Sequence, residues 1–189
     1  MDIKLKLIFA FTILYGLFEL FMGTRYRKER TIEKSGDRLS IWMMAIGISI
    51  GYWISFMIGS THTGRIYYWN TFFIIGSVIE AIGLVVRIRA INTLKQQFTY
   101  TVTEIQNHEL IERGLYKYIR HPGYLGQLII FLGISLTISN WLSVIGMIVP
   151  VFLGYLYRIK VEEKFMIKQM GEKFIEYQKR TNRLIPMIY

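Results

Sequence analysis

The stretch GLYKYIRHPGYLG, residues 114–126, lies between two long apolar regions, and the rest of the chain is organised around it. Its polar and aromatic side chains fall within nine residues: Tyr116, Arg120, His121 and Tyr124. Because a residue before proline is steered away from helical backbone, we expect His121 in a turn and Pro122 at the first position of a helix. The free N–H groups of that helix N-terminus favour an anionic ligand group or a hydrogen-bond acceptor. The stretch therefore predicts a ligand site, unless Arg120 and His121 only mark the water-facing end of a membrane helix.

The composition predicts an integral membrane protein rather than a soluble one. Apolar residues make up 52% of the 189, and the net charge of +10 gathers at the ends of the apolar runs, so we expect membrane lipids and no nucleic acid as partners. The chain has no cysteine, which excludes disulfides and Cys-ligated metals. Its three histidines, His62, His108 and His121, are too widely spaced for a recognisable metal motif, so we expect no metal site.

Five apolar runs are long enough to predict five transmembrane helices. They are residues 3–22, 40–59, 66–86, 123–138 and 141–157. Lys and Arg number 20 on one side of the resulting topology and three on the other, which predicts an N-terminus outside and a C-terminus in the cytoplasm. The first run resembles a signal peptide, but no small-residue cleavage site follows it, so we interpret it as a retained anchor.

The runs divide the chain into two parts. Residues 1–93 hold three crossings, and residues 94–189 are predicted as the cofactor-binding and catalytic region. Ser139 and Asn140 alone separate the last two runs, which predicts an antiparallel helical hairpin over residues 123–157. A polar helix from about 160 to 180 is expected to follow, residues 98–103 alternate as a short strand or extended segment would, and residues 23–39 are expected as a solvated loop.

Ionisable residues at the ends of the runs are the remaining candidates. Arg158 and Glu162 share a helix face where the last crossing leaves the membrane, and Glu163 follows them. The hairpin returns these residues to the boundary where His121 lies, so cationic, acidic and aromatic groups should converge there. The alternative is a surface ion pair contributing about 0.3–0.5 kcal/mol. Glu80 inside the third run is either functional or a structural hydrogen-bonding group, and Glu19 is given no role.

These residues resemble a family of integral-membrane methyltransferases, those related to isoprenylcysteine carboxyl methyltransferase, which use S-adenosylmethionine. The resemblance covers residues from about 94 to 186 and rests on residues 114–126, on Arg158-x-x-x-Glu162-Glu163, on the Gly171 to Tyr177 pattern and on Arg183-Leu-Ile-Pro186. It implies an all-α membrane protein of five transmembrane helices, with a C-terminal helical hairpin and a cytoplasmic cofactor-binding region.

The resemblance also implies roles for individual residues. Those expected to bind the cofactor are His108, Glu109, Leu110, Ile111, Tyr116, His121, Pro122, Gly123, Tyr124 and Glu162. Arg158 is expected beside the methyl acceptor, and Glu162 is expected to act in catalysis from the cofactor side. Methyl transfer to an ionised carboxylate needs alignment rather than a base, which suits a fork of arginine N–H groups on the acceptor.

The predicted function is S-adenosylmethionine-dependent methyl transfer to a lipid-like acceptor that enters from the bilayer. The acceptor is expected to be an isoprenylcysteine carboxylate or a related small lipophilic carboxylate or hydroxyl. Two other classes stay open: a small transporter or channel lined by Glu80 and the basic loops, and a membrane scaffold whose basic tail binds anionic lipid. Binding of the cofactor distinguishes the enzyme from both.

Overall fold

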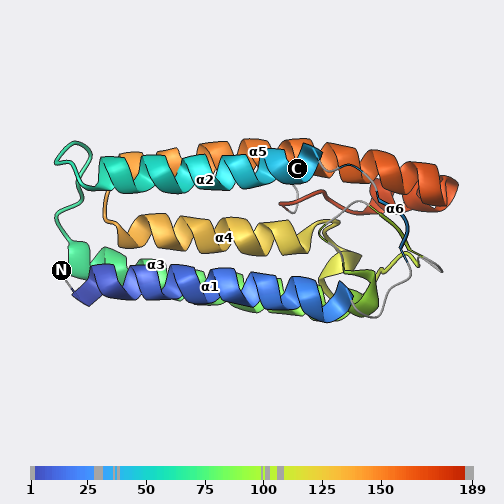
Figure 1. Ribbon diagram of the computed structural model, residues 1–189, viewed down its shortest axis with the longest axis horizontal. Helices are drawn as coiled ribbons and strands as arrows, with labels where there is room; N and C mark the ends of the chain where they lie inside the picture. Colours follow the sequence, from blue (N-terminus) through green and yellow to red (C-terminus); the bar gives the residue numbers. More distant parts are fainter. Residues whose placement is uncertain are drawn as a thin grey trace.

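The protein is an elongated bundle of helices that run side by side (Figure 1). The structure, a computed structural model, describes residues 3–27, 32–35, 37, 39–98, 100, 103–105 and 109–185. Its elements in chain order are α1 (Ile3–Arg27), β1 (Ile32–Ser35), α2 (Leu39–Gly59), α3 (Trp69–Leu94), η1 (Lys95–Gln97), β2 (Thr103–Ile105), η2 (Gly114–Lys117), α4 (Pro122–Thr137), α5 (Trp141–Met170) and α6 (Glu172–Arg180).

Four of these helices, α1, α2, α3 and α5, are long and apolar enough to cross a membrane. The protein is accordingly an integral membrane protein. The fifth predicted crossing, α4, has 16 residues and so is about 24 Å long, somewhat short of a ~30 Å hydrocarbon core. It lies in the middle of the bundle, with most of its residues buried (Figure 1). By contrast, α5 has 30 residues and extends beyond the ends of the other long helices (Figure 1).

Glycines bring two pairs of helices into backbone contact. A Cβ added to Gly76 of α3 would lie 2.7 Å from the carbonyl oxygen of Gly133 on α4, and one added to Gly47 of α2 would lie 2.6 Å from that of Pro150 on α5. Small residues permit such close approach between membrane helices, where packing and polar contacts rather than water drive association. The α4–α5 hairpin joins the two pairs, as the sequence predicted.

The first helix packs in a different way, through large side chains. Phe9 stacks on Phe56 of α2 with ring centroids 5.3 Å apart, and Tyr15 meets Phe131 of α4 edge to face at 6.4 Å. Near its end, Glu19 forms an ion pair with Arg87 of α3. No role was predicted for this glutamate, and in the structure it ties α1 to the rest of the bundle.

Three predicted boundaries were wrong. The first run was expected to end at residue 22, but α1 continues to Arg27 and so includes the start of the expected loop. The third run was expected to end at Val86, but α3 continues to Leu94, because the charge of Arg87 is met by Glu19 inside the bundle. The polar helix expected over residues 160–180 is the end of α5 followed by α6, and the break falls at Gly171. The φ of +54° at Gly171 is left-handed, a conformation that suits glycine at a helix C-terminus.

The predicted strand exists, but its position and its partner were not foreseen. The strand β2 begins at Thr103 and pairs in antiparallel fashion with β1, with Ile32 opposite Ile105. Since β1 lies in the loop that was expected to be solvated coil, the small sheet joins the two longest connections of the chain. It adds a minor β element to the predicted all-α fold.

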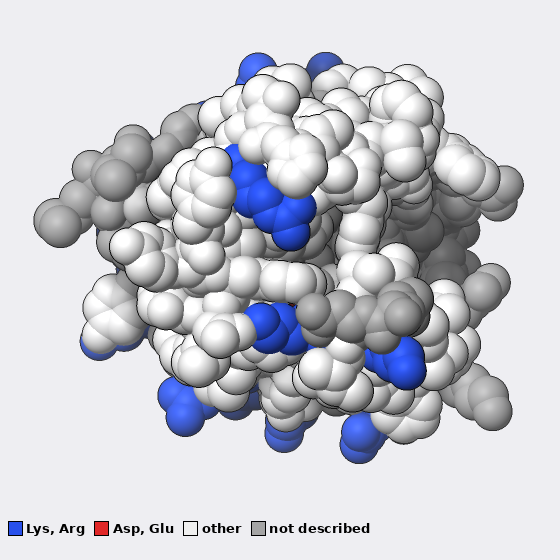
Figure 2. Space-filling view, turned by 90° about the vertical axis from the view of Figure 1, so that its left-hand side faces the viewer, with Lys and Arg blue, Asp and Glu red and all other residues white. Residues whose placement is uncertain are grey.

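Buried polar groups close one end of the bundle, here called the hairpin end, which comprises residues 59–69 and 137–141 (Figure 2). Asn140 is 1% exposed; its Oδ1 accepts hydrogen bonds from the N–H groups of Leu142 and Ser143, and its Nδ2 donates to the carbonyl of Thr63 at 2.8 Å. Figure 2 shows Lys and Arg side chains at this end of the bundle. None of the residues 59–69 and 137–141 is Asp or Glu.

Candidate active site

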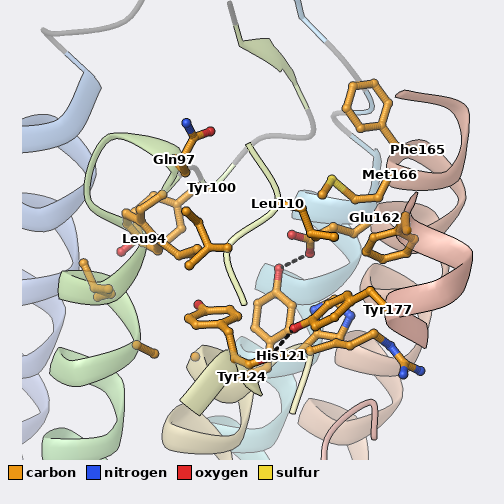
Figure 3. Close-up of a pocket in the computed structure, with 18 of the residues that line it drawn as sticks. Leu94, Gln97, Tyr100, Leu110, His121, Tyr124, Glu162, Phe165, Met166 and Tyr177 are labelled. Atoms are coloured by element: carbon orange, nitrogen blue, oxygen red, sulfur yellow. Dashed lines mark hydrogen bonds between the residues drawn. The ribbon is translucent and has the colours of Figure 1, made fainter. Parts of the chain in front are cut away.

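A pocket lies at the opposite end of the bundle, here called the pocket end, where α3, α4, α5 and α6 meet (Figure 3). Leu94, Gln97 and Tyr100 lie on its α3 side, and Glu162, Phe165 and Met166 on its α5 side (Figure 3). Further lining residues include Met44, Arg87, Phe98, Glu109, Leu110, Ile111, Tyr116, Arg120, His121, Gly123, Tyr124, Gln127, Phe174 and Tyr177. The lining is thus aromatic and apolar with a few ionisable groups, which is typical of a small-molecule site.

The turn at His121 forms as the sequence predicted. Pro122 is the first residue of α4, and His121 precedes it with φ −124° and ψ 54°, outside the helical region. The imidazole of His121 stacks on the ring of Tyr124 at 5.6 Å between centroids, and Tyr124 stacks in turn on Tyr155 at 5.1 Å. The proline therefore orients two aromatic faces that line one wall of the pocket.

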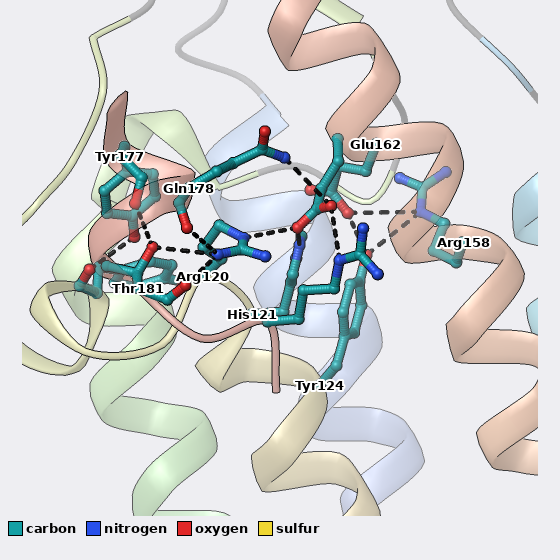
Figure 4. A network of polar contacts seen from close by, with 11 residues as sticks. Arg120, His121, Tyr124, Arg158, Glu162, Tyr177, Gln178 and Thr181 are labelled. Carbon is teal, nitrogen blue, oxygen red and sulfur yellow. Dashed lines mark hydrogen bonds and ion pairs between the residues drawn. The ribbon is translucent and has the colours of Figure 1, made fainter. Parts of the chain in front are cut away.

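Tyr124 connects the two ionisable residues of the predicted catalytic pair. Its hydroxyl donates to Glu162 Oε2 at 2.8 Å and accepts from Arg158 Nε at 3.2 Å, whereas the direct Arg158–Glu162 distance is 3.9 Å (Figure 4). The tyrosine hydroxyl, rather than the ion pair, carries the short contacts. A substitution at Tyr124 should consequently affect both charged residues.

Arg158 is a buried residue behind Tyr124. It is 1% exposed, and besides Tyr124 its guanidinium donates to Ser40 Oγ at 2.5 Å and to the carbonyl of Tyr100 at 3.0 Å. An exposed ion pair is thereby excluded. Arg158 itself does not belong to the pocket lining and lies behind Tyr124, which does.

Glu163 holds the turn in place, a role that the sequence did not reveal. Its carboxylate accepts from Arg120 Nε at 2.7 Å and lies 3.4 Å from His121 Nε2, and its other oxygen accepts from Arg183 Nε at 3.0 Å (Figure 4). The backbone supports the same arrangement, since the N–H of Arg120 donates to the carbonyl of Asn182 at 2.8 Å. The C-terminal segment thus fixes the position of His121.

Two buried tyrosines brace the floor of the pocket. The hydroxyl of Tyr177 on α6 donates to the backbone carbonyl of Tyr116 at 2.6 Å. Burial raises the pKa of Tyr116 well above its ordinary value, although the charge of Arg87 opposes this shift. Burial also raises the pKa of Tyr177, against the charge of Arg120. Both phenols are therefore neutral donors at physiological pH, and neither supplies a phenolate.

Arg87 forms part of the α3 wall, although the sequence analysis ended the third apolar run just before it, at residue 86. It is 3% exposed, and it pairs in bidentate fashion with Glu19, Nε to Oε1 at 2.9 Å and Nη2 to Oε2 at 2.8 Å. The hydroxyl of Tyr100 also donates to Glu19. Burial raises the pKa of Tyr100, and the negative charge of Glu19 adds to that shift. One feature of the sequence could have indicated this buried position: the arginine is flanked by the apolar residues Val85, Val86 and Ile88.

The structure brings most of the predicted cofactor residues together. Those that line the pocket are Glu109, Leu110, Ile111, Tyr116, His121, Gly123, Tyr124 and Glu162. Pro122 is buried next to them without lining the pocket, and His108 lies outside the described residues. Glu80, for which two interpretations were open, is buried against Gly133 and does not line the pocket.

Known proteins resemble this chain over the region that forms the pocket. Residues 71–173, more than half of the chain, match the model of the phospholipid methyltransferase family. The chain belongs to that family. Its sequence is 27% identical over 180 residues to a protein-S-isoprenylcysteine O-methyltransferase of Dictyostelium discoideum, covering 93% of this chain and 74% of the relative. These matches confirm the family resemblance seen in the sequence.

Other relatives are longer than this chain, which matches only part of their length. A probable protein-S-isoprenylcysteine O-methyltransferase of Oryza sativa subsp. indica is 32% identical, covering 64% of each chain, and the Saccharomyces cerevisiae enzyme is 31% identical, covering 61% of this chain and 49% of that one. The structure of a eukaryotic isoprenylcysteine carboxyl methyltransferase superposes with a TM-score of 0.62 at 23% identity, over 76% of this chain and 52% of the other. The chain thus spans half to three quarters of the length of these relatives, and the superposition shows a common fold.

Proposed function

We propose that the protein is a membrane methyltransferase that uses S-adenosylmethionine and methylates the carboxylate of a prenylated cysteine or of a similar lipophilic molecule. The observation that carries the proposal is the convergence of His121, Tyr124 and Glu162 on one pocket from two helices that the chain joins only through a hairpin. The names of the relatives supply the reaction and the class of acceptor.

The pocket has the groups that the cofactor requires. Glu162 provides a negative charge for a cationic group, and the stacked rings of His121 and Tyr124 provide a flat aromatic wall. The side-chain oxygen of Gln97 is buried without a hydrogen-bond partner in the part of the chain that the structure describes, so it is available to an amino or hydroxyl group of a ligand. S-adenosylmethionine, when bound, supplies a methyl group on a positively charged sulfur.

The chain's own residues then act mainly by orientation. Glu162 accepts the hydrogen bond of Tyr124, so its carboxylate is held at the pocket wall rather than turned toward solvent. Glu163 holds His121 through Arg120 and the C-terminal segment. Because an acceptor carboxylate is already ionised, the reaction needs alignment of nucleophile and methyl group and no proton transfer. No phenolate is required of the buried tyrosines.

Arg158 is the proposed group that orients the acceptor. Its guanidinium is fixed by Ser40 of α2 and by the carbonyl of Tyr100, and it lies next to the hydroxyl of Tyr124. Met44, also on α2, lines the pocket at the same side, which gives that side an apolar surface. A lipophilic carboxylate entering between helices would meet apolar side chains first, and the positive charge of Arg158 would act on its reacting end through the hydroxyl of Tyr124, which covers the guanidinium.

We further propose five crossings with the pocket end in the cytoplasm and the N-terminus outside, and a division into residues 1–93 and 94–189. The helix α4 serves as a short fifth crossing because neighbouring helices enclose it. Since the chain has no cysteine, single cysteines at the exposed positions Thr61 and Lys117 test the orientation. Membrane-impermeant reagent added outside should label Thr61→Cys and not Lys117→Cys; the reverse pattern contradicts this topology.

The activity is tested with purified protein, methyl-labelled S-adenosylmethionine and N-acetyl-S-farnesylcysteine, with the amide of the same compound as the matched control. Label should appear as a base-labile methyl ester on the acid and not on the amide. A parallel incubation with membrane lipid extract reveals another acceptor, such as a phospholipid. Absence of incorporation in all three incubations contradicts the proposed function.

A further inference from the structure

The buried guanidinium of Arg87 lines the pocket but has no role in the proposed reaction. Glu19 accepts hydrogen bonds from its Nε and Nη2 atoms, and this bidentate pair does not use its Nη1. That Nη1 faces the start of α4: a Cβ added to Gly123 would lie 2.7 Å from it. Both Arg87 and Gly123 line the pocket, and the lack of a side chain at Gly123 lets the cation lie directly against the backbone of this turn.

The first turn of α4 adds a favourable field at this point. A helix N-terminus carries unpaired N–H groups and the positive end of the helix dipole, and α4 has 16 residues. Within this turn the N–H groups of Tyr124 and Leu125 are both paired with the carbonyl of His121, and Pro122 has no N–H. The N–H of Gly123 is left, next to Arg87. An anion at this position would meet a buried cation and a backbone donor together.

The surroundings of Arg87 hold the cation in one orientation. Its guanidinium carbon lies 5.4 Å from the ring centroid of Phe98 and 5.9 Å from that of Tyr100. The bidentate pair with Glu19 offsets the cost of burying the charge, and it fixes the plane of the fork so that Nη1 is directed away from α1. The remaining nitrogen is thereby held at the pocket wall, against Gly123.

The other lining arginine is already engaged. Arg120 donates to Glu163, to the carbonyl of Gln178 and to Thr181, so its charge is committed to the turn (Figure 4). Arg87 belongs to α3 and lies near Tyr100, whereas Glu162 belongs to α5; Figure 3 shows Tyr100 and Glu162 on different sides of the pocket. The pocket therefore presents a cation on one wall and a carboxylate on the other.

We propose that Arg87, oriented by Glu19 and aided by the N–H of Gly123, binds the α-carboxylate of the methionyl part of the cofactor. This assignment rests on the proposed function, because it identifies the part of S-adenosylmethionine that each wall receives. The positive sulfur and amino groups belong on the side of Glu162, and the negative carboxylate belongs on the side of Arg87. Arg87 then selects for cofactors with an intact amino-acid tail.

The test compares two ligands that differ only in that group, S-adenosylmethionine and its decarboxylated form, titrated into the full-length protein in detergent. Loss of a charge-assisted hydrogen bond should weaken binding of decarboxylated S-adenosylmethionine to the wild type about ten- to hundredfold. In Arg87→Gln the affinity for the intact cofactor should fall by a similar factor, while the affinity for the decarboxylated form should change little. The two affinities should therefore converge. The exposed neighbour Arg89→Gln is the matched control and should retain the wild-type ratio.

Arg87→Gln leaves Glu19 buried without its partner, so the double variant Glu19→Gln/Arg87→Gln accompanies it and should show the same convergence. Equal weakening of both ligands would mean that Arg87 only joins α1 to α3, and unchanged affinities would remove it from the site; either result overturns the proposal. If Arg87→Gln raised the KM for the acceptor but left the ratio of the two ligand affinities unchanged, Arg87 would bind the carboxylate of the acceptor instead. That result would also overturn the proposal. Failure of the wild type to bind either ligand would contradict the proposed function itself.

Discussion

The two ends of the bundle both bury polar side chains, but they use them differently. At the hairpin end, Asn140 directs its side chain to backbone groups, and the indole N–H of Trp69 donates to the carbonyl of Thr137 at 3.0 Å. At the pocket end the polar partners are mostly charged side chains. Gln97 Oε1 is buried without a partner among the described residues, and the pair of Arg87 with Glu19 does not use its Nη1. The first arrangement completes the fold, and the second leaves groups for a ligand.

This difference predicts which variants change activity or ligand binding and which change stability. Substitutions at the pocket end should affect turnover or affinity beyond any effect on folding. Those at the hairpin end should lower the free energy of unfolding and leave affinity intact. The variants below differ in the size of the expected effect.

The largest effect is expected for Arg158→Ala. If Arg158 orients the acceptor, its loss should lower kcat by about a hundredfold or more, as removal of a preorganised donor does in other enzymes, with little change in cofactor affinity. Steady-state kinetics with prenylcysteine acceptor measures this, and the exposed Lys160→Ala on the same helix is the control. Arg158→Lys separates charge from geometry, because it retains the charge without the planar fork. Full activity in Arg158→Ala removes this residue from the mechanism.

Asn140→Ala should lower the free energy of unfolding by about 2–3 kcal/mol, since it removes both the N-cap of α5 and the hydrogen bond to Thr63. Thermal unfolding in detergent reports the loss, with the exposed His62→Ala in the same region as the control. Cofactor affinity should stay at the wild-type value. A large loss of affinity in Asn140→Ala would mean that the two ends are not separate in function.

His121→Ala and Tyr124→Ala should each weaken cofactor binding by about 1–3 kcal/mol, because each removes a buried polar group and an aromatic face from the pocket wall. Calorimetry measures the affinities, and the exposed Tyr118→Ala from the same turn is the control. Unchanged affinity in both variants would reduce the His121 turn to a helix boundary.

The smallest effect is expected for Glu162→Gln. This change removes a partly exposed charge and nearly preserves shape, so cofactor affinity should fall by about fivefold or less. Turnover should recover as the cofactor concentration is raised, in contrast to Arg158→Ala. Glu172→Gln, at an exposed position on α6, is the control. A loss of kcat that excess cofactor does not restore would show that the two residues act as a unit.

The features that could be predicted from the sequence are the local ones. Local patterns predicted the apolar helices, the hairpin at Asn140 and the proline-initiated helix after His121, because each depends on residues close in the chain. The family resemblance added the residues of the α4 and α5 walls. The Glu19–Arg87 pair and the contacts of Glu163 join segments far apart, and β1 pairs with a strand about 70 residues away. Hydropathy reports that such groups are polar, but it does not report their partners.

The most direct test of the account is titration of S-adenosylhomocysteine into the wild type, Asn140→Ala and Tyr124→Phe in parallel. Tyr124→Phe removes only the hydroxyl that joins Arg158 to Glu162. We expect saturable binding to the wild type, the same affinity in Asn140→Ala despite its lower stability, and affinity about ten- to hundredfold weaker in Tyr124→Phe. No binding to the wild type, or equal affinity in all three proteins, would contradict a cofactor site at the pocket end.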